Sequence, residues 1–286
     1  MTKYIKVNKC KAFFAFLFLI YLLFCQSCAH MRMSVKQTKS FFNASKTSYV
    51  DSTVVINENK IHFIQTGNVN GPTLFFVHGS PGSWDAFKLY LTDSVLLKKF
   101  RMIAIDRPGF GFSNFGESKK LFEQAHLIEA FSTKIKNNQN CYLIGHSYGG
   151  PVIVKMAIDM PNDFAGIIVL AGAVDPEAEN PEKWRYFFKA KPFRYIVPGA
   201  LRPANDELWW LKEDLKIMKP TLNKIKTRVL IIHGTNDNLV PYSNVAFMKT
   251  QFINAKNIDI ISIKEADHFI PWSHFEIIRD QLKKLP

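Results

Sequence analysis

Six short, uninterrupted apolar runs recur along the chain, and polar or glycine-containing segments separate them. They cover residues 73–79, 101–106, 141–146, 166–172, 228–234 and 258–263. Runs of this length without polar alternation are typical of strands that are buried on both faces of a parallel sheet. Two earlier runs, 53–56 and 61–66, are separated by Asn57-Glu58-Asn59 and predict a hairpin.

Segments with helical spacing lie between these runs, for example 121–136, 151–159 and 274–284. Alternation of strands and helices predicts an α/β fold, here a mostly parallel eight-stranded sheet flanked by helices. Residues 174–223 break the alternation, because they separate two strands by about fifty residues and contain eight of the chain's aromatic residues and six prolines. This segment is too long for a plain crossover and predicts a small helical cap over the strand ends.

The net charge of +13 is concentrated near the N-terminus, where residues 1–50 carry eight lysines and arginines and no acid. The remaining basic residues are scattered, which argues against nucleic acid as a partner. The lysines precede an apolar run at 12–25, a pattern typical of an export signal. We therefore expect a signal peptide or membrane anchor at 1–28, a polar tether at 29–50 and the main domain at 51–286.

Two cysteines close the apolar run in Cys25-Gln26-Ser27-Cys28, which resembles a bacterial lipoprotein signal with Cys28 as the lipidated residue. The alternatives are an uncleaved N-terminal helix and simple secretion. A lipid anchor or an uncleaved helix would associate the protein with a membrane, and all three interpretations place the main domain outside the cytoplasm. Cys141 is the one cysteine beyond this region, so a metal site built from thiolates is excluded.

The segment Gly145-His146-Ser147-Tyr148-Gly149 follows an apolar run and precedes a helical one. A G-x-S-x-G sequence between strand and helix is the pattern of a nucleophile elbow, which presents a serine hydroxyl on a sharp turn. A serine in an ordinary tight turn is the simpler alternative. A serine nucleophile needs a histidine base and a carboxylate that orients the base. Asp237 and His268 follow later strands and end on the same side of the sheet as Ser147.

Five segments together resemble the α/β-hydrolase superfamily over residues 50–286: "HGSPGSW" (78–84), "DRPGFGFS" (106–113), "GHSYGG" (145–150), "GTNDNLVP" (234–241) and "DHFIPW" (267–272). The resemblance implies a catalytic triad with Ser147 as nucleophile, Asp237 as acid and His268 as base. It also implies an oxyanion hole formed by the backbone N–H groups of Ser80 and Tyr148.

Other residues compete for these roles. Asp175 is an alternative acid. It follows the predicted strand at 166–172, and some branches of the family place the acid after the corresponding strand. Trp84 and the Tyr148 side chain are candidates for lining the pocket, with a core position as the alternative. Structural roles are expected for the remaining acidic and histidine candidates, which are Asp106, Asp267, His78, His146, His126, His233 and His274.

The resemblance implies a serine hydrolase that cleaves a carboxylic ester of a small apolar substrate through an acyl-enzyme, with no metal or organic cofactor. Aminopeptidase or amidase action, carbon–carbon bond hydrolysis and cofactor-free perhydrolysis use the same triad and stay open. A non-catalytic ligand-binding protein and an acyltransferase are further alternatives. Nothing in the sequence indicates the oligomeric state.

Overall fold

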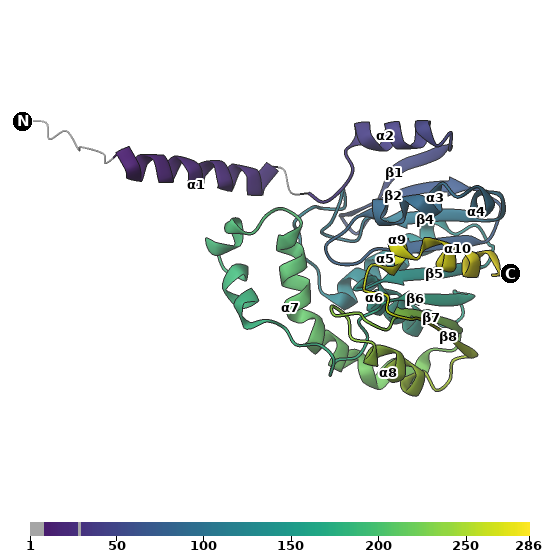
Figure 1. Cartoon of the computed structure of the whole chain (residues 1–286). Helices are drawn as coiled ribbons and strands as arrows, with labels where there is room; N and C mark the ends of the chain where they lie inside the picture. Colours follow the sequence, from purple (N-terminus) through teal and green to yellow (C-terminus); the bar gives the residue numbers. More distant parts are fainter. Residues whose placement is uncertain (1–8, 28–29) are drawn as a thin grey trace, which may run out of the picture.

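An eight-stranded sheet forms the centre of the molecule in the computed structural model, which describes residues 9–27 and 30–286 (Figure 1). The strands lie in the order β1-β2-β4-β3-β5-β6-β7-β8. Their bounds are β1 Tyr49–Ile56, β2 Asn59–Gly67, β3 Thr73–Val77, β4 Arg101–Ile105, β5 Cys141–His146, β6 Gly166–Leu170, β7 Arg228–Gly234 and β8 Asn257–Ile263. β1 and β2 form the antiparallel hairpin, β2 pairs antiparallel with β4, and all other pairs are parallel. The predicted fold class is confirmed.

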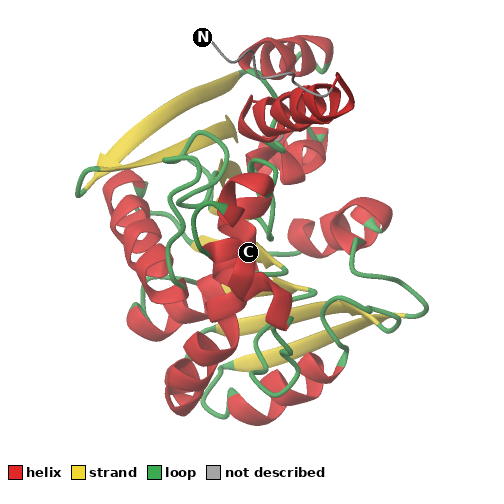
Figure 2. Cartoon of the chain, turned by 90° about the vertical axis from the view of Figure 1, so that its left-hand side faces the viewer, coloured by secondary structure: helices red, strands yellow, loops and turns green. Residues whose placement is uncertain are grey.

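Helices cover both faces of this sheet (Figures 1 and 2). On one face α5 (Leu121–Ile135), α6 (Gly149–Asp159) and α8 (Ser243–Gln251) pack on an apolar core that includes Phe75. On the other, the core that includes Phe76 is covered by the short 3-10 helix η1 (Trp84–Phe87), α3 (Lys88–Leu91), α4 (Ser94–Lys99), α9 (Ile270–Ser273) and α10 (Phe275–Lys283). Neighbouring β3 residues thus belong to opposite cores, because successive side chains of a strand point to opposite faces.

The segment between β6 and β7 forms the cap that the sequence predicted. It contains α7 (Leu201–Met218) and three 3-10 helices, η2 (Lys183–Lys189), η3 (Phe193–Ile196) and η4 (Lys219–Lys224). η2 packs on α7 and on η3, and Arg194 of η3 pairs with Asp206 of α7, at one end of the sheet (Figure 1). Neither η2 nor η3 has a buried residue, whereas α7 buries one side. Tight packing in the cap is therefore concentrated on α7.

The structure departs from the expectation of a polar tether at 29–50. α2 (Val35–Ala44) is a capped helix in which the Ser34 hydroxyl accepts a bond from the Gln37 N–H and the Gln37 side chain accepts the Ser34 N–H. Phe42 is buried, and its ring stacks 4.2 Å from Tyr49 and 5.8 Å from Trp84. The segment belongs to the domain because a polar helix with one apolar side docks on the sheet.

α1 (Lys9–Ser27) precedes this region and projects from the body on the side of the cap (Figure 1). The Tyr21 hydroxyl donates a 2.8 Å hydrogen bond to the carbonyl of Ile196 at the end of η3. Within the described ranges, no helix combines the length and hydropathy that crossing a membrane requires. Cys28, the expected lipidation site, lies outside the described residues.

Candidate active site

Ser147 occupies the sharp turn between β5 and α6. Its backbone has φ +54°, a left-handed conformation that a non-glycine residue adopts at a cost of about 1–3 kcal/mol. The Ser147 N–H donates to Leu170 O at 3.0 Å, which ties the turn to β6. A side chain at Gly145 would lie 2.3 Å from the Gly149 carbonyl, so the turn closes only without one. This is the geometry that the nucleophile-elbow pattern predicted.

Asp237 and His268 form a buried pair on the loops that follow β7 and β8. His268 Nδ1 lies 2.7 Å from Asp237 Oδ2, while Asp237 Oδ1 accepts the backbone N–H groups of Leu239 and Val240 at 2.9 and 2.8 Å. Burial alone raises the pKa of Asp237, but hydrogen bonds from His233, His268 and the Val240 N–H hold it well below its ordinary value. The carboxylate is therefore ionised, and His268 Nδ1 carries the proton that it donates.

His146, the residue before Ser147, joins this pair to the elbow. Its ring lies 4.8 Å from the His268 ring, and its Nε2 is 3.1 Å from the His268 carbonyl. Burial and the neighbouring His268 lower the pKa of His146 to about 3, so it stays neutral. No hydrogen bond joins the Ser147 hydroxyl to His268 in the part of the chain that the structure describes. Such catalytic bonds are often long before substrate binds.

The loop after β3 packs against the elbow and carries Ser80, one of the two expected oxyanion donors. The Gly79 carbonyl accepts bonds from His78 Nδ1 at 2.7 Å and from Arg107 Nη2 at 2.9 Å. A trans peptide points its C=O and N–H to opposite sides, so these bonds turn the Ser80 N–H away from Arg107. A Cβ placed on Gly79 would lie 2.8 Å from the Ser147 Cβ, which shows how closely the loop packs on the elbow.

Arg107 organises this loop, although the sequence analysis assigned it no role. The side chain is fully buried and donates to the carbonyls of His78 and Gly79, to Gln124 Oε1 at 2.6 Å, and to both oxygens of Glu207 on α7 at 2.8 Å. Its guanidinium also lies 4.6 Å from the centre of the Tyr148 ring. Arg107 therefore contacts both segments that carry the expected oxyanion donors and links them to the cap.

The structure separates the competing acids. Asp175 accepts the N–H of Glu177 at 2.9 Å, and among the described residues the acid that is paired with His268 is Asp237. Asp106 accepts the N–H groups of Trp84 and Phe112 at 2.7 and 2.8 Å, which organises its loop. Asp267 accepts the Phe269 N–H at 2.9 Å.

The two candidate pocket residues point inward. Trp84 is fully buried in the core that contains Phe76 and stacks on Phe42, so the expectation that it lines a pocket is wrong. Tyr148 is also buried, with its ring on Arg107, and burial and the charge of Glu207 raise its pKa well above the ordinary value. The Tyr148 side chain thus packs inside the protein, while its backbone N–H stands at the start of α6.

His233 is a further residue whose part at the site the sequence analysis missed. It is fully buried, and its Nε2 lies 3.3 Å from Asp237 Oδ2 and 3.0 Å from the Val240 carbonyl. The position at the end of a buried strand, four residues before the acid, was the available signal. His233 helps to keep Asp237 ionised.

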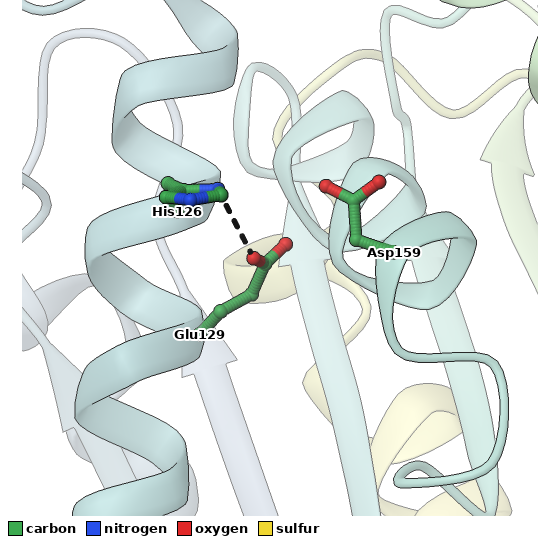
Figure 3. A group of neighbouring side chains, drawn as sticks. All are labelled: His126, Glu129 and Asp159. Carbon is green, nitrogen blue, oxygen red and sulfur yellow. Dashed lines mark ion pairs between the residues drawn. The ribbon is translucent and has the colours of Figure 1, made fainter.

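A separate group of His126, Glu129 and Asp159 lies where α5 meets α6 (Figure 3). Their potential ligand atoms lie within 4.8 Å of one another, and His126 Nδ1 is 3.6 Å from Glu129 Oε2. The Lys155 ammonium, however, binds both carboxylate oxygens of Asp159. Because a cation already neutralises this acid, the group by itself does not define a metal site.

Comparison with known proteins agrees with this geometry. A family model described as the alpha/beta hydrolase fold matches residues 72–196. Over 97% of the chain, the structure is similar to a bacterial membrane phospholipase A, with a TM-score of 0.64 and 18% identity. The chain has the α/β-hydrolase fold. A solved putative aryl esterase of Burkholderia cenocepacia shares this fold with a TM-score of 0.66 and 20% identity, over 82% of the chain and 97% of the esterase.

Curated relatives match the chain over different lengths. It is 35% identical to a probable 1-acylglycerol-3-phosphate O-acyltransferase of Oryza sativa over 127 residues, which are 42% of the chain and 30% of the relative. It is 26% identical to a bifunctional esterase/perhydrolase of Acinetobacter calcoaceticus over 78% of the chain and 94% of the relative. The chain thus spans less than half the length of the first of these relatives.

Proposed function

We propose that this α/β-hydrolase cleaves carboxylic esters through an acyl-enzyme on Ser147. The observation that carries the proposal is the buried Asp237–His268 pair, held at 2.7 Å, whose histidine contacts His146, the residue before Ser147 in the strained turn between β5 and α6. A hydroxyl is a weak nucleophile, and an adjacent imidazole that is oriented by a carboxylate activates it.

In the first half-reaction, Ser147 Oγ attacks the ester carbonyl carbon while His268 Nε2 takes the hydroxyl proton. The carbonyl oxygen becomes an oxyanion, which the backbone N–H groups of Ser80 and Tyr148 stabilise. Each such donor typically contributes about 3 kcal/mol to the barrier reduction. Collapse of the intermediate breaks the bond to the alcohol oxygen, and His268 returns the proton to that leaving group.

In the second half-reaction, water replaces the alcohol. His268 takes a proton from the water as its oxygen attacks the acyl carbon, and Ser147 leaves with that proton when the acid is released. Asp237 stays ionised throughout and stabilises the charged imidazole. Its bonds from Leu239 and Val240 suit this role, because they fix the carboxylate while leaving Oδ2 for His268.

The relatives support an ester as the substrate over the other bonds that this triad can cleave. The Acinetobacter esterase/perhydrolase is matched over most of both chains, and the Burkholderia structure is a putative aryl esterase. The Oryza relative is a probable acyltransferase, although the match covers less than a third of it. Release of free acid in the presence of added alcohols distinguishes hydrolysis from acyl transfer.

The test combines turnover with covalent labelling. The full chain is expected to hydrolyse short p-nitrophenyl esters and to react with a fluorophosphonate that mass spectrometry locates on Ser147. Ser147→Ala should lower kcat by at least about 10⁴-fold and abolish labelling, because no other group replaces the nucleophile. Ser243→Ala, at an exposed serine, is the matched control and should behave as wild type. Turnover retained by Ser147→Ala would refute the proposal.

A further inference from the structure

The cap carries several exposed aromatic side chains on two helices that contact each other, and we call this group the cap aromatic surface. It lies on η2 and η3 and consists of Trp184, Tyr186, Phe187, Phe193 and Tyr195. Their exposed fractions range from 40% for Tyr195 to 67% for Phe187. Scattered single apolar residues need no explanation, but aromatic residues gathered in one short segment mark a surface that binds a partner.

Cations alternate with these rings. Residues 183–196 contain Lys183, Arg185, Lys189, Lys191 and Arg194 and no acid. Arg185 pairs with Glu182 and Arg194 pairs with Asp206, whereas the three lysines have no carboxylate partner among the described residues. The surface therefore keeps an unneutralised positive charge beside its aromatic rings.

The surface is continuous with the apolar helix α1. α1 contacts η3, and the Tyr21 hydroxyl bonds to the Ile196 carbonyl at 2.8 Å. Along α1 the side chains of Phe13, Phe14 and Phe16 are more than half exposed. α1 and the cap lie on the same side of the molecule (Figure 1), so the exposed aromatic residues of both belong to that side.

Two consecutive acids on α7 connect the surface to the candidate active site. Asp206 binds Arg194 of η3, and Glu207 binds Arg107, whose guanidinium holds the Gly79 carbonyl. Both acids are buried. The position of the cap aromatic surface is therefore fixed relative to the loop that carries the Ser80 N–H.

We infer that the cap aromatic surface docks on a lipid bilayer with anionic headgroups. Aromatic rings partition to the boundary between headgroups and acyl chains, and neighbouring lysines bind an anionic leaflet. Each lysine increases partitioning onto the membrane by about fivefold. Docking places the active site beside the bilayer. If the proposed esterase activity holds, its substrates are then amphiphilic esters that are dissolved in the lipid. The inference does not depend on lipidation of Cys28.

The direct test measures insertion of Trp184 in the full chain bound to vesicles of phosphatidylglycerol and phosphatidylcholine. Lipids brominated along their acyl chains should quench Trp184, read as the difference between wild type and Trp184→Phe. Phe187→Ser combined with Phe193→Ser should remove that quenching. The matched control is Val69→Ser combined with Ile253→Ser, at residues that are 54% and 70% exposed elsewhere, and it should leave the quenching unchanged.

The lysines are tested by charge. Lys183→Gln combined with Lys191→Gln should weaken partitioning onto anionic vesicles by about 25-fold and leave neutral vesicles unaffected. Lys224→Gln combined with Lys226→Gln removes the same charge from exposed positions away from η2 and η3 and should have little effect. Equal losses in the two lysine pairs, or an unquenched Trp184 in vesicle-bound protein, would overturn the inference.

Two further measurements distinguish a failure of the docking inference from a failure of the proposed esterase activity. Lipid-free self-association that Phe187→Ser with Phe193→Ser abolishes would identify the surface as an interface between copies, and the bilayer inference would be wrong. Turnover of a soluble ester and of an ester held in vesicles separates docking from catalysis. The cap variants should slow hydrolysis of the vesicle ester alone, whereas Trp184 quenching with neither ester cleaved would refute the proposed esterase and leave docking supported.

Discussion

The loops around Ser147 and the cap segment 183–196 differ in how their charged and aromatic side chains are accommodated. In the loops around Ser147, the side chains of Arg107 and Asp237 are buried, and both charged groups have partners at hydrogen-bond distance. In the cap segment, aromatic rings and lysines face solvent. The two regions therefore differ in what stabilises them. Internal hydrogen bonds preorganise the loops, whereas the cap segment exposes apolar surface that an external partner could cover.

The strongest test of preorganisation is Asp237→Asn. The amide keeps the size of the side chain but favours the wrong tautomer of His268, because its nitrogen can donate to Nδ1 where the carboxylate accepts. We expect kcat for a p-nitrophenyl ester to fall by about 10⁴-fold. Asp267→Asn, in the same loop as His268, should change kcat little, since its carboxylate accepts the Phe269 N–H. Comparable losses in the two variants would mean that the loop, and not the Asp237–His268 pair, limits the rate.

The second test loosens the oxyanion loop from the cap. Glu207→Gln removes the charge that binds Arg107 and should lower kcat by roughly 10- to 100-fold with a smaller change in KM, because the Ser80 N–H loses alignment that matters in the transition state. Glu213→Gln, on the exposed side of the same helix, is the matched control.

Stability needs a separate measurement in this variant, since removing one partner of a buried ion pair costs about 3–5 kcal/mol. Turnover is therefore measured at a temperature where circular dichroism shows both variants folded. A folded Glu207→Gln protein with wild-type kcat would contradict the role assigned to Arg107.

The smallest expected effect concerns Glu129, a buried acid that is less completely paired than those around Ser147. Burial and the nearby Asp159 raise its pKa from 4.5 to about 7, while Lys155 opposes the shift. His126 Nδ1 lies 3.6 Å from its carboxylate. Between these values the folded chain binds more protons than the unfolded chain, so stability falls as the pH rises from about 5 to 8.

Glu129→Gln removes this loss. The variant should match wild type at pH 5 and gain about 2 kcal/mol at pH 8, seen as a rise in Tm of about 5 °C in thermal unfolding. Glu123→Gln, earlier on α5, is the control. An unchanged difference between wild type and variant across this pH range would show that Glu129 is ionised in the folded chain throughout.

The sequence predicted the strands, the cap and the elbow because these depend on local patterns. An apolar run identifies a buried strand such as β5, and glycines at 145 and 149 mark the turn that presents Ser147. Chain order and strand ends were enough to select Asp237 and His268, which the structure brings together. Their catalytic roles stay a prediction until the kinetic tests are made.

The features that the sequence did not reveal depend on distant partners. Arg107 is visible in its motif, but its role appears only when Glu207, a hundred residues later, lies beside it. The sequence left Trp84 between a pocket and a core position, because nothing local indicated that Phe42 would stack on it. The Ser34–Gln37 capping box did signal α2, yet the polar composition around it suggested a tether.

The adjacency of Asp206 and Glu207 has a consequence for how substrate enters. A displacement of α7 large enough to admit a bulky ester breaks the ion pairs to Arg194 and Arg107 together, since successive residues of one helix hold them. Breaking the second pair frees the peptide that orients the Ser80 N–H. Opening of the cap therefore also loosens the loop that carries the Ser80 N–H, and under the proposed function turnover requires the cap to close over the bound ester.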